Sequence, residues 1–415
     1  VVNRGLIRTM PNPDAEFRML AERDVLPGTI LMARNKPASF PTPFQPHQGY
    51  GLNMSFMIVG LADEWGTVID NPEQLVLKND FEPSRIYALK GSVIDGDITA
   101  NQQLWIRAGQ NLQGNTLKLR NLHPSDVSWL DAGRDIVTGT VDMVLVSRKG
   151  SVIVEGPGTL LLTAGRDVFG QEVALIAAGN RDYFYLITEE PIGDPIKGLP
   201  TISASIEVIA GLSGKQPDYA AFGAAYLDPA NIAAMPGYLK TTVGGQLLPI
   251  YLLDDYKSVG DGIQKQARFG LVSFVRTMTG ETLSPLDAWA RFLTLPEMTR
   301  QVFLRQVYMQ ELREAGRDQV AGAVTGGYNR GYGATETLFP GKDWRGDVLA
   351  GRAIFRTMTG GDIRVMTPGG GLQVAGLGTE VGSGYGLVTL GSGRIENFAR
   401  NDVTVNRSRI LTFSG

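Results

Sequence analysis

Arg345-Gly346-Asp347 places a guanidinium and a carboxylate on either side of a glycine. This is the tripeptide that integrins bind, because the cation can reach an acidic pocket while the carboxylate ligates a metal ion. Gly-Asp also occurs at Gly96-Asp97 and Gly361-Asp362, so a turn that happens to follow an arginine explains the phrase better. Arg345, Gly346 and Asp347 therefore remain a candidate cell-binding turn, with a structural turn as the preferred interpretation.

Other residues that could do chemistry are few. The chain has no cysteine and only two histidines, His47 and His123, which argues against thiolate sites, zinc catalysis and Ser–His chemistry. Cleavage of glycosidic bonds needs two carboxylates at a set separation. The adjacent pair Asp254-Asp255 precedes a predicted helix, where a capping role is the simpler interpretation. We therefore expect no catalytic residues, no cofactor and no metal site.

Composition indicates a protein with a core and many turns. Hydrophobic residues make up 43% of the 415 residues and charged residues 20%, so the chain can bury a core. The net charge of -3 argues against nucleic acid or an anionic membrane as the main partner. No apolar run is long enough to span a bilayer. The 52 glycines indicate many turns between many short strands.

One short phrase recurs along the chain, in which alanine and glycine lead to Asp or Asn and then to an aliphatic residue. Gly with Asp or Asn favours a tight turn, and the aliphatic residue begins a strand whose alternate side chains point inward. The irregular spacing fits one or two coils of a β-solenoid, although hairpins of a β-sandwich are the alternative. The phrase is found at 108–112, 132–136, 164–168 and, in a variant form, 399–403.

The middle of the chain changes to a helical period. Ser284 and Pro285 are a helix-capping residue and a first-turn proline, which predicts a helix through Phe292. Further helices are predicted at 218–226, 261–278 and 297–315, the last of them ended by Gly316. A helical subdomain therefore interrupts the solenoid.

These patterns divide the chain into four parts. Residues 1–80 form an irregular N-terminal segment with a proline-rich strap at 37–46. Residues 81–215 are β-helix coils, 216–320 are an α-helical insert, and 321–415 are coils that continue beyond the fragment. The predicted fold class is mainly β, a parallel β-helix with an inserted α-helical subdomain.

The late part of the chain resembles the C-terminal region of filamentous-haemagglutinin-family exoproteins, the passengers of two-partner secretion. The resemblance covers roughly 81–415 and rests on the order of several phrases. The family's late region also has a helical insert, which the insert here resembles. The phrases lie at 303–308, 311–313, 331–340, 344–348, 360–371 and 406–412. The resemblance implies a right-handed parallel β-helix, export through an outer-membrane transporter partner, and a role in adhesion or biofilm.

The expected protein is thus a non-enzymatic adhesin segment, secreted or displayed on the surface of a Gram-negative bacterium. Its expected partners are the transporter and a host or bacterial cell-surface protein or glycan, with self-association also open. A filament- or surface-layer-forming structural protein and a polysaccharide-degrading β-helix enzyme remain alternatives. Trp105, Trp129 and Trp344 are expected to pack between coils rather than stack on sugars.

Overall fold

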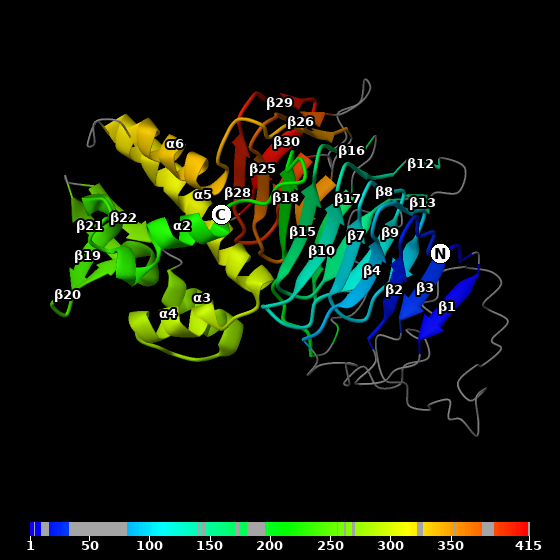
Figure 1. Ribbon diagram of the computed structural model, residues 1–415, viewed down its shortest axis with the longest axis horizontal. Helices are drawn as coiled ribbons and strands as arrows, with labels where there is room; N and C mark the ends of the chain where they lie inside the picture. Colours follow the sequence, from blue (N-terminus) through cyan, green and yellow to red (C-terminus); the bar gives the residue numbers. More distant parts are fainter. Residues whose placement is uncertain are drawn as a thin grey trace. The chain divides into compact units, whose positions relative to one another are not determined.

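The computed structural model describes most of the chain, arranged as two compact units. Unit 1 comprises 1–214 and 345–415, and unit 2 comprises 215–344 (Figure 1). The proline-rich strap, His47 and Asp255 lie outside the described residues. The described residues are 1–3, 5–9, 16–32, 81–139, 141–142, 147–148, 150–170, 174–180, 196, 198–254, 256–260, 263–267, 270–321, 327–351, 354–375 and 386–413.

Unit 1 is built from three sheets in which all strands are parallel. Sheet 1 has the order β1 (Leu6–Thr9), β3 (Thr29–Met32), β6 (Asp97–Thr99), β9 (Thr116–Arg120), β14 (Val152–Glu155), β17 (Ala174–Gly179), β24 (Ile354–Thr357), β27 (Gly386–Thr389), β30 (Arg409–Thr412). Sheet 2 has the order β2 (Arg18–Ala21), β4 (Ser84–Ala88), β7 (Leu104–Ala108), β10 (Val127–Ala132), β15 (Thr159–Ala164), β18 (Ser205–Ala210), β25 (Ile363–Thr367), β28 (Ile395–Ala399). Sheet 3 has the order β29 (Val403–Asn406), β26 (Leu372–Ala375), β23 (Val348–Ala350), β16 (Val168–Gly170), β11 (Ile136–Val137), β8 (Leu112–Gln113), β5 (Val93–Ile94).

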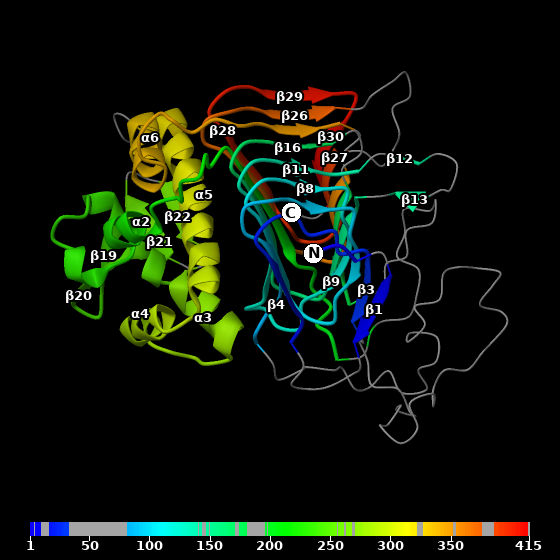
Figure 2. The same cartoon turned by 45° about the vertical axis from the view of Figure 1, so that its right-hand side comes forward.

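From β4 onward each coil contributes one strand to each sheet, so the chain winds around a common core. The coil β7, β8, β9 is followed by β10, β11, β14, and equivalent strands pair in parallel from coil to coil. A short antiparallel pair, β12 (Val141–Asp142) and β13 (Ser147–Arg148), lies between β11 and β14 in the chain. Figure 2 shows the three sheets around the core. The predicted parallel β-helix is therefore confirmed.

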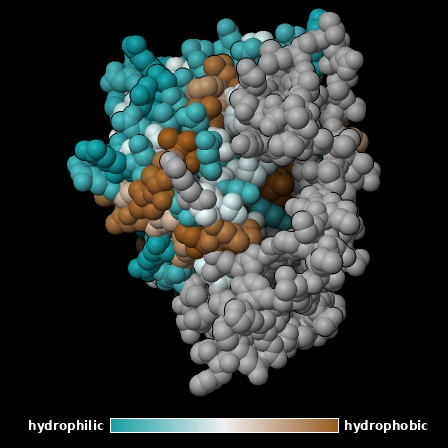
Figure 3. Space-filling view, turned by 90° about the vertical axis from the view of Figure 1, so that its right-hand side faces the viewer, coloured by the Kyte–Doolittle hydropathy of each residue, from teal (hydrophilic) through white to brown (hydrophobic). Residues whose placement is uncertain are grey.

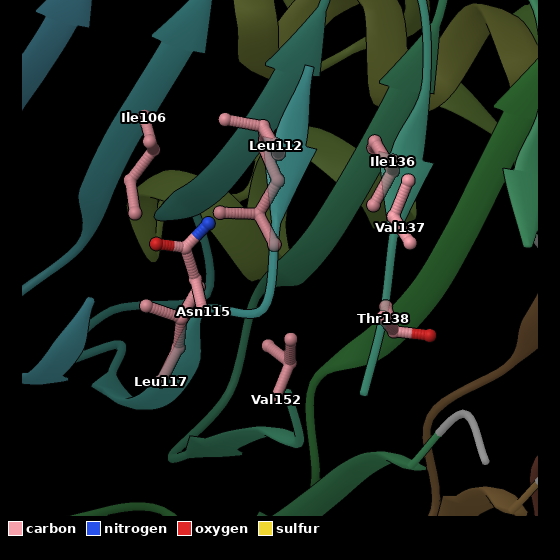
Figure 4. A pocket seen from close by; sticks show the side chains of 9 residues that line it. Ile106, Leu112, Asn115, Leu117, Ile136, Val137, Thr138 and Val152 are labelled. Carbon is pink, nitrogen blue, oxygen red and sulfur yellow. The ribbon is translucent and has the colours of Figure 1, made fainter. Parts of the chain in front are cut away.

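The core consists of stacked columns of aliphatic side chains. Because side chains alternate along a strand, every second residue of sheet 2 points inward and meets its equivalents in neighbouring coils. One such column is fully buried and contains Ile86, Ile106, Leu130, Leu162, Val208 and Val365. A cavity of about 20 Å³ remains in this core, lined by residues that include Ile106, Leu117 and Val152 (Figure 4). It has room for about one water molecule and none for a substrate.

The recurring phrase forms the turn between sheet 2 and sheet 3, and a ladder of hydrogen bonds explains its Asp and Asn residues. In each coil the side-chain oxygen accepts a backbone N–H from the same turn of the next coil. Asn111 accepts from Asp135 at 3.2 Å, Asp135 from Asp167 at 3.2 Å, and Asp167 from Asp347 at 2.9 Å. Asp347 then accepts from Gly371 at 2.6 Å. The polar residues of the phrase thus stack one coil on another.

Unit 2 is inserted into one of these turns. Ala210 ends β18 and Gly211 follows it, while Gly346-Asp347 completes the turn before β23. The backbone N–H of Arg345 donates to the carbonyl of Gly211 at 3.3 Å, so the two halves of the turn meet. The recurring turn phrase is therefore present here as in other coils, but unit 2 separates its first half, Ala210-Gly211, from its second half, Gly346-Asp347.

Unit 2 contains α-helices, short 3₁₀ turns and hairpins. The helices are α2 (Tyr219–Tyr226), α3 (Leu271–Thr279), α4 (Pro285–Leu293), α5 (Glu297–Ala321) and α6 (Gly327–Leu338). The 3₁₀ turns are η1 (Pro229–Asn231), η2 (Gly237–Leu239) and η3 (Ile250–Leu252). The hairpins are β19 (Lys240–Val243) with β20 (Gln246–Pro249), and β21 (Tyr256–Gly260) with β22 (Ile263–Ala267).

Two helix predictions are confirmed and three details are wrong. Ser284 caps α4 as expected, and Asp218, predicted only as the start of a helix, caps α2; each accepts a backbone N–H of the first turn. The helix predicted over 261–278 is a hairpin strand followed by α3, because antiparallel pairing with β21 takes 263–267. Gly316 does not stop α5, since a single glycine costs an interior helix only about 1 kcal/mol. The insert also runs beyond residue 320, where coils were expected, because α6 belongs to it.

Removal of residues 212–345 is expected to leave a folded β-helix. This deletion joins Gly211 to Gly346 and restores Ala-Gly-Gly-Asp-Val, which matches the turn at 164–168. We expect circular dichroism of the variant to lose the signal of the helices of unit 2 and keep a cooperative β-sheet transition on heating. Recovery of aggregate alone, or melting without a transition, would contradict the modular insertion.

Candidate binding face

The candidate cell-binding turn is part of the stacked turns. Asp347 belongs to the hydrogen-bond ladder through one carboxylate oxygen. A Cβ on Gly346 would lie 1.9 Å from the carbonyl oxygen of Arg166, so Gly346 is pressed against the preceding coil. Arg345 is exposed. The structure thus gives Gly346 and Asp347 a role in stacking coils, which accounts for both residues without a receptor.

The remaining residues singled out by sequence also have local partners. Asp254 accepts the backbone N–H of Ser273 at 2.7 Å and so caps α3. His123 stacks on Phe81 with ring centroids 4.3 Å apart. Trp344 is buried and donates its indole N–H to Pro340 at 3.0 Å, so it packs within unit 2 and not between coils as expected. Within the described ranges, no cluster of three His, Cys, Asp or Glu could hold a metal, and no helix is long and apolar enough to cross a membrane.

The outward surface of sheet 2 carries an array that the sequence did not reveal as one feature. In the column that runs from β4 to β10, Arg85 lies beside Trp105, and Trp105 beside Trp129. The neighbouring column places Tyr87 beside Arg107, and Arg107 beside Asp131. We call these side chains the aromatic–arginine face: Arg85, Tyr87, Trp105, Arg107, Trp129 and Asp131.

The two tryptophans of this face are half-buried and held in fixed positions. Their ring centroids are 5.7 Å apart in an edge-to-face arrangement. The indole N–H of Trp105 donates to the carbonyl of Val127 at 2.9 Å, and that of Trp129 donates to the hydroxyl of Thr163 at 2.8 Å. Because both indole donors bind the protein itself, each ring has one set orientation. The exposed part of each ring is therefore a preorganised apolar surface.

Guanidinium groups lie near the aromatic rings. The guanidinium of Arg85 lies 5.5 Å from the ring centre of Trp105, and that of Arg107 lies 4.6 Å from the ring centre of Trp129. These distances permit cation–π attraction. Arg107 also pairs with Asp131 at 3.1 Å, and Asp131 accepts the hydroxyl of Thr163 at 2.6 Å. Arg107, Asp131 and Thr163 therefore form a polar group beside the indoles.

Four basic side chains on and beside this face have acidic partners. Arg85 bonds Glu82 at 2.7 Å, Arg18 bonds Glu16 at 2.6 Å and Lys90 bonds Glu22 at 2.6 Å. Burial would lower the pKa of Arg85, but the hydrogen bond and charge of Glu82 outweigh it and raise that pKa. With Arg107 and Asp131, four cations thus face four carboxylates, Glu16, Glu22, Glu82 and Asp131.

Apolar side chains border the same region. Leu20 is 63% exposed and Leu89 is 58% exposed, the first within β2 and the second directly after β4. Figure 3 faces the end of the β-helix where β1 lies and shows apolar and polar side chains next to each other on that surface. Leu20 and Leu89 thus add apolar surface beside the aromatic–arginine face.

Buried charges farther along sheet 2 have a structural role. The guanidinium of Arg364 bonds Glu207 at 2.8 Å, Glu396 at 3.0 Å and also Asp362. Burial lowers the pKa of Arg364, yet the charges of Asp362, Glu207 and Glu396 outweigh burial and raise it. These carboxylates are committed to one cation, which ties three coils together.

Unit 2 has a comparable buried cluster. The guanidinium of Arg330 on α6 bonds both carboxylate oxygens of Glu311 and reaches Asp318 at 2.6 Å, both on α5. The hydroxyl of Tyr251 in η3 donates to Glu311. Burial, together with the charge of Glu311, raises the pKa of Tyr251 well above its ordinary value. The cluster clamps α5, α6 and η3 to one another.

Comparisons with known proteins give no relative for this chain, so its class is described by its fold alone. No family model matches the chain, and no curated protein or solved structure gives a significant match. The chain is therefore defined as a parallel β-helix protein with an inserted helical unit.

Proposed function

We propose that the chain is an adhesive segment of a secreted or cell-surface exoprotein of the filamentous-haemagglutinin type, exported through an outer-membrane transporter. The observation that carries the proposal is the parallel β-helix, whose outward side chains are held in register from coil to coil. The phrases shared with that family, their order along the chain and the helical insert in the late part support it further.

The architecture suits adhesion for a physical reason. From β4 onward every coil adds one strand to each of the three sheets, so outward side chains form rows on surfaces that scarcely deform. Rows of fixed groups can engage a polymer or a cell surface at several points, and the several weak contacts then add to a firm attachment. Buried carboxylates such as Glu207 and Glu311, which could otherwise serve a hydrolase, are paired with arginines. Adhesion is therefore favoured over cleavage of polysaccharide.

Binding of the purified chain to whole cells tests this function. The chain is applied to bacterial and host cells, and bound protein and released reducing sugar ends are measured in the same wells. We expect saturable binding with no release of sugar ends. Release of sugar ends would assign the chain to polysaccharide-degrading enzymes, and absence of binding to every cell type would contradict the adhesive role.

A further inference from the structure

The aromatic–arginine face has the composition of a ligand-binding surface rather than of ordinary exposed β-sheet. Large aromatic side chains bury much area for little lost conformational freedom. Trp105 and Trp129 remain partly exposed, and their indole donors are already bonded within the protein. The ring surface that Arg85 and Arg107 leave uncovered is therefore apolar and fixed in place. We propose that this face binds a neutral polysaccharide, an inference that rests on the adhesive function proposed above.

The charge of the face decides between neutral and anionic ligands. Binding to sulfated glycans, nucleic acid or anionic lipid draws on cations that lack carboxylate partners. Here Arg18, Arg85, Lys90 and Arg107 are each paired with a carboxylate. The four positive and four negative groups cancel, so these pairs provide no net field that would attract an anion.

The chemistry of the face matches that of a sugar. A pyranose presents apolar C–H groups on its ring faces and hydroxyls around its edge. The indoles of Trp105 and Trp129 offer apolar rings, and the pair of Arg107 with Asp131 offers donors and acceptors beside them.

The shape of the face favours a linear polymer over a folded protein. Its rows run across strands, and neighbouring coils lie about 4.8 Å apart. The aromatic residues come from three successive coils, which gives a strip rather than a broad patch. A stable interface with a protein needs about 800 Å² on each partner, commonly with a wide apolar centre. A narrow strip of rings fits an extended glycan chain.

Affinity electrophoresis tests the proposal. The chain is run through native gels that contain hydroxyethylcellulose, dextran or soluble mannan as neutral probes, or heparin as the anionic probe. We expect at least one neutral polysaccharide to retard the chain. The retardation should be the same at low salt, where charges are screened over about 30 Å, and at high salt, where they are screened over about 3 Å, because binding to a neutral polymer does not depend on charge attraction. Trp129→Ala and Trp105→Ala should each weaken retardation about tenfold or more.

Matched variants separate binding from folding. Trp289→Ala removes another half-buried tryptophan from unit 2 and should leave retardation unchanged. Trp129→Phe keeps an aromatic ring and should keep most of the binding, even if Trp129→Ala fails to fold. Retention by heparin alone with loss at high salt would overturn the proposal, as would full retardation of well-folded Trp129→Ala.

Treatment of cells with protease distinguishes the proposal from the adhesive function. If the chain binds untreated cells but neither treated cells nor any neutral glycan, the ligand is a protein, and the glycan proposal fails while adhesion stands. If treated cells retain binding and Trp129→Ala loses it, the glycan proposal is supported. A chain that binds no cells but is retarded by a neutral glycan supports the glycan site and contradicts the adhesive function.

Discussion

Arg330→Ala is expected to destabilise unit 2 by about 3–5 kcal/mol, the usual cost of breaking a buried ion pair. The substitution leaves the carboxylates of Glu311 and Asp318 buried without the cation that now bonds both. It also removes the guanidinium that lies 4.1 Å from the ring centre of Tyr238. Denaturant unfolding followed by the helical signal at about 222 nm should report the loss.

Controls separate burial from charge. Arg291 pairs with Glu281 at 3.0 Å, but both side chains are about two-fifths exposed, so Arg291→Ala should cost less than about 1 kcal/mol. Arg330→Lys should not restore stability, because an ammonium cannot bond both oxygens of a carboxylate through a planar fork. Equal losses for Arg330→Ala and Arg291→Ala would show that the buried cluster contributes no more than a surface pair.

The β-helix could be predicted from the sequence because its evidence is local. Turn residues followed by alternating aliphatic residues indicate strands over a few positions, as at 132–136 and 164–168. Caps such as Ser284 are local in the same way. The strand β22 (Ile263–Ala267) falls within a predicted helix because pairing with β21 overrides the intrinsic preference of a short segment.

The aromatic–arginine face and the divided turn could not be predicted because both depend on register. Trp105 and Trp129 are neighbours only because β7 and β10 pair in one particular register, and this register cannot be derived from local sequence patterns. Gly211 and Gly346 belong to one turn although all of unit 2 separates them. The alternation in 104–107 was visible, but which of its side chains face outward together is set by long-range pairing.

Gly165→Ala is expected to destabilise the β-helix strongly. A Cβ at this position would lie 2.0 Å from the carbonyl oxygen of Gly133 in the preceding coil. Gly133 itself is placed over Gly109 in the same way, so the oxygen belongs to backbone that is fixed on both sides. The coils must separate locally to admit the methyl group, which breaks hydrogen bonds such as that from Gly165 to Ala132 at 2.8 Å.

The expected loss is at least that of an overpacked core, about 1–3 kcal/mol, and thermal unfolding followed by the β-sheet signal at about 218 nm measures it. Gly316→Ala is the matched control. Gly316 lies within α5, and a methyl group added there would meet no atom within 4 Å, so the same substitution should stabilise unit 2 by about 0.5–1 kcal/mol. A loss of stability for Gly165→Ala with a gain for Gly316→Ala would follow from the close packing of coils. Equal and small changes in stability for both variants would show that the coils have room for a methyl group at Gly165. Gly346 lies in the neighbouring column of the same turns, where an added Cβ would lie 1.9 Å from the carbonyl oxygen of Arg166. The same argument therefore makes Gly346 a structural necessity of the turn whether or not a receptor binds Arg345 and Asp347.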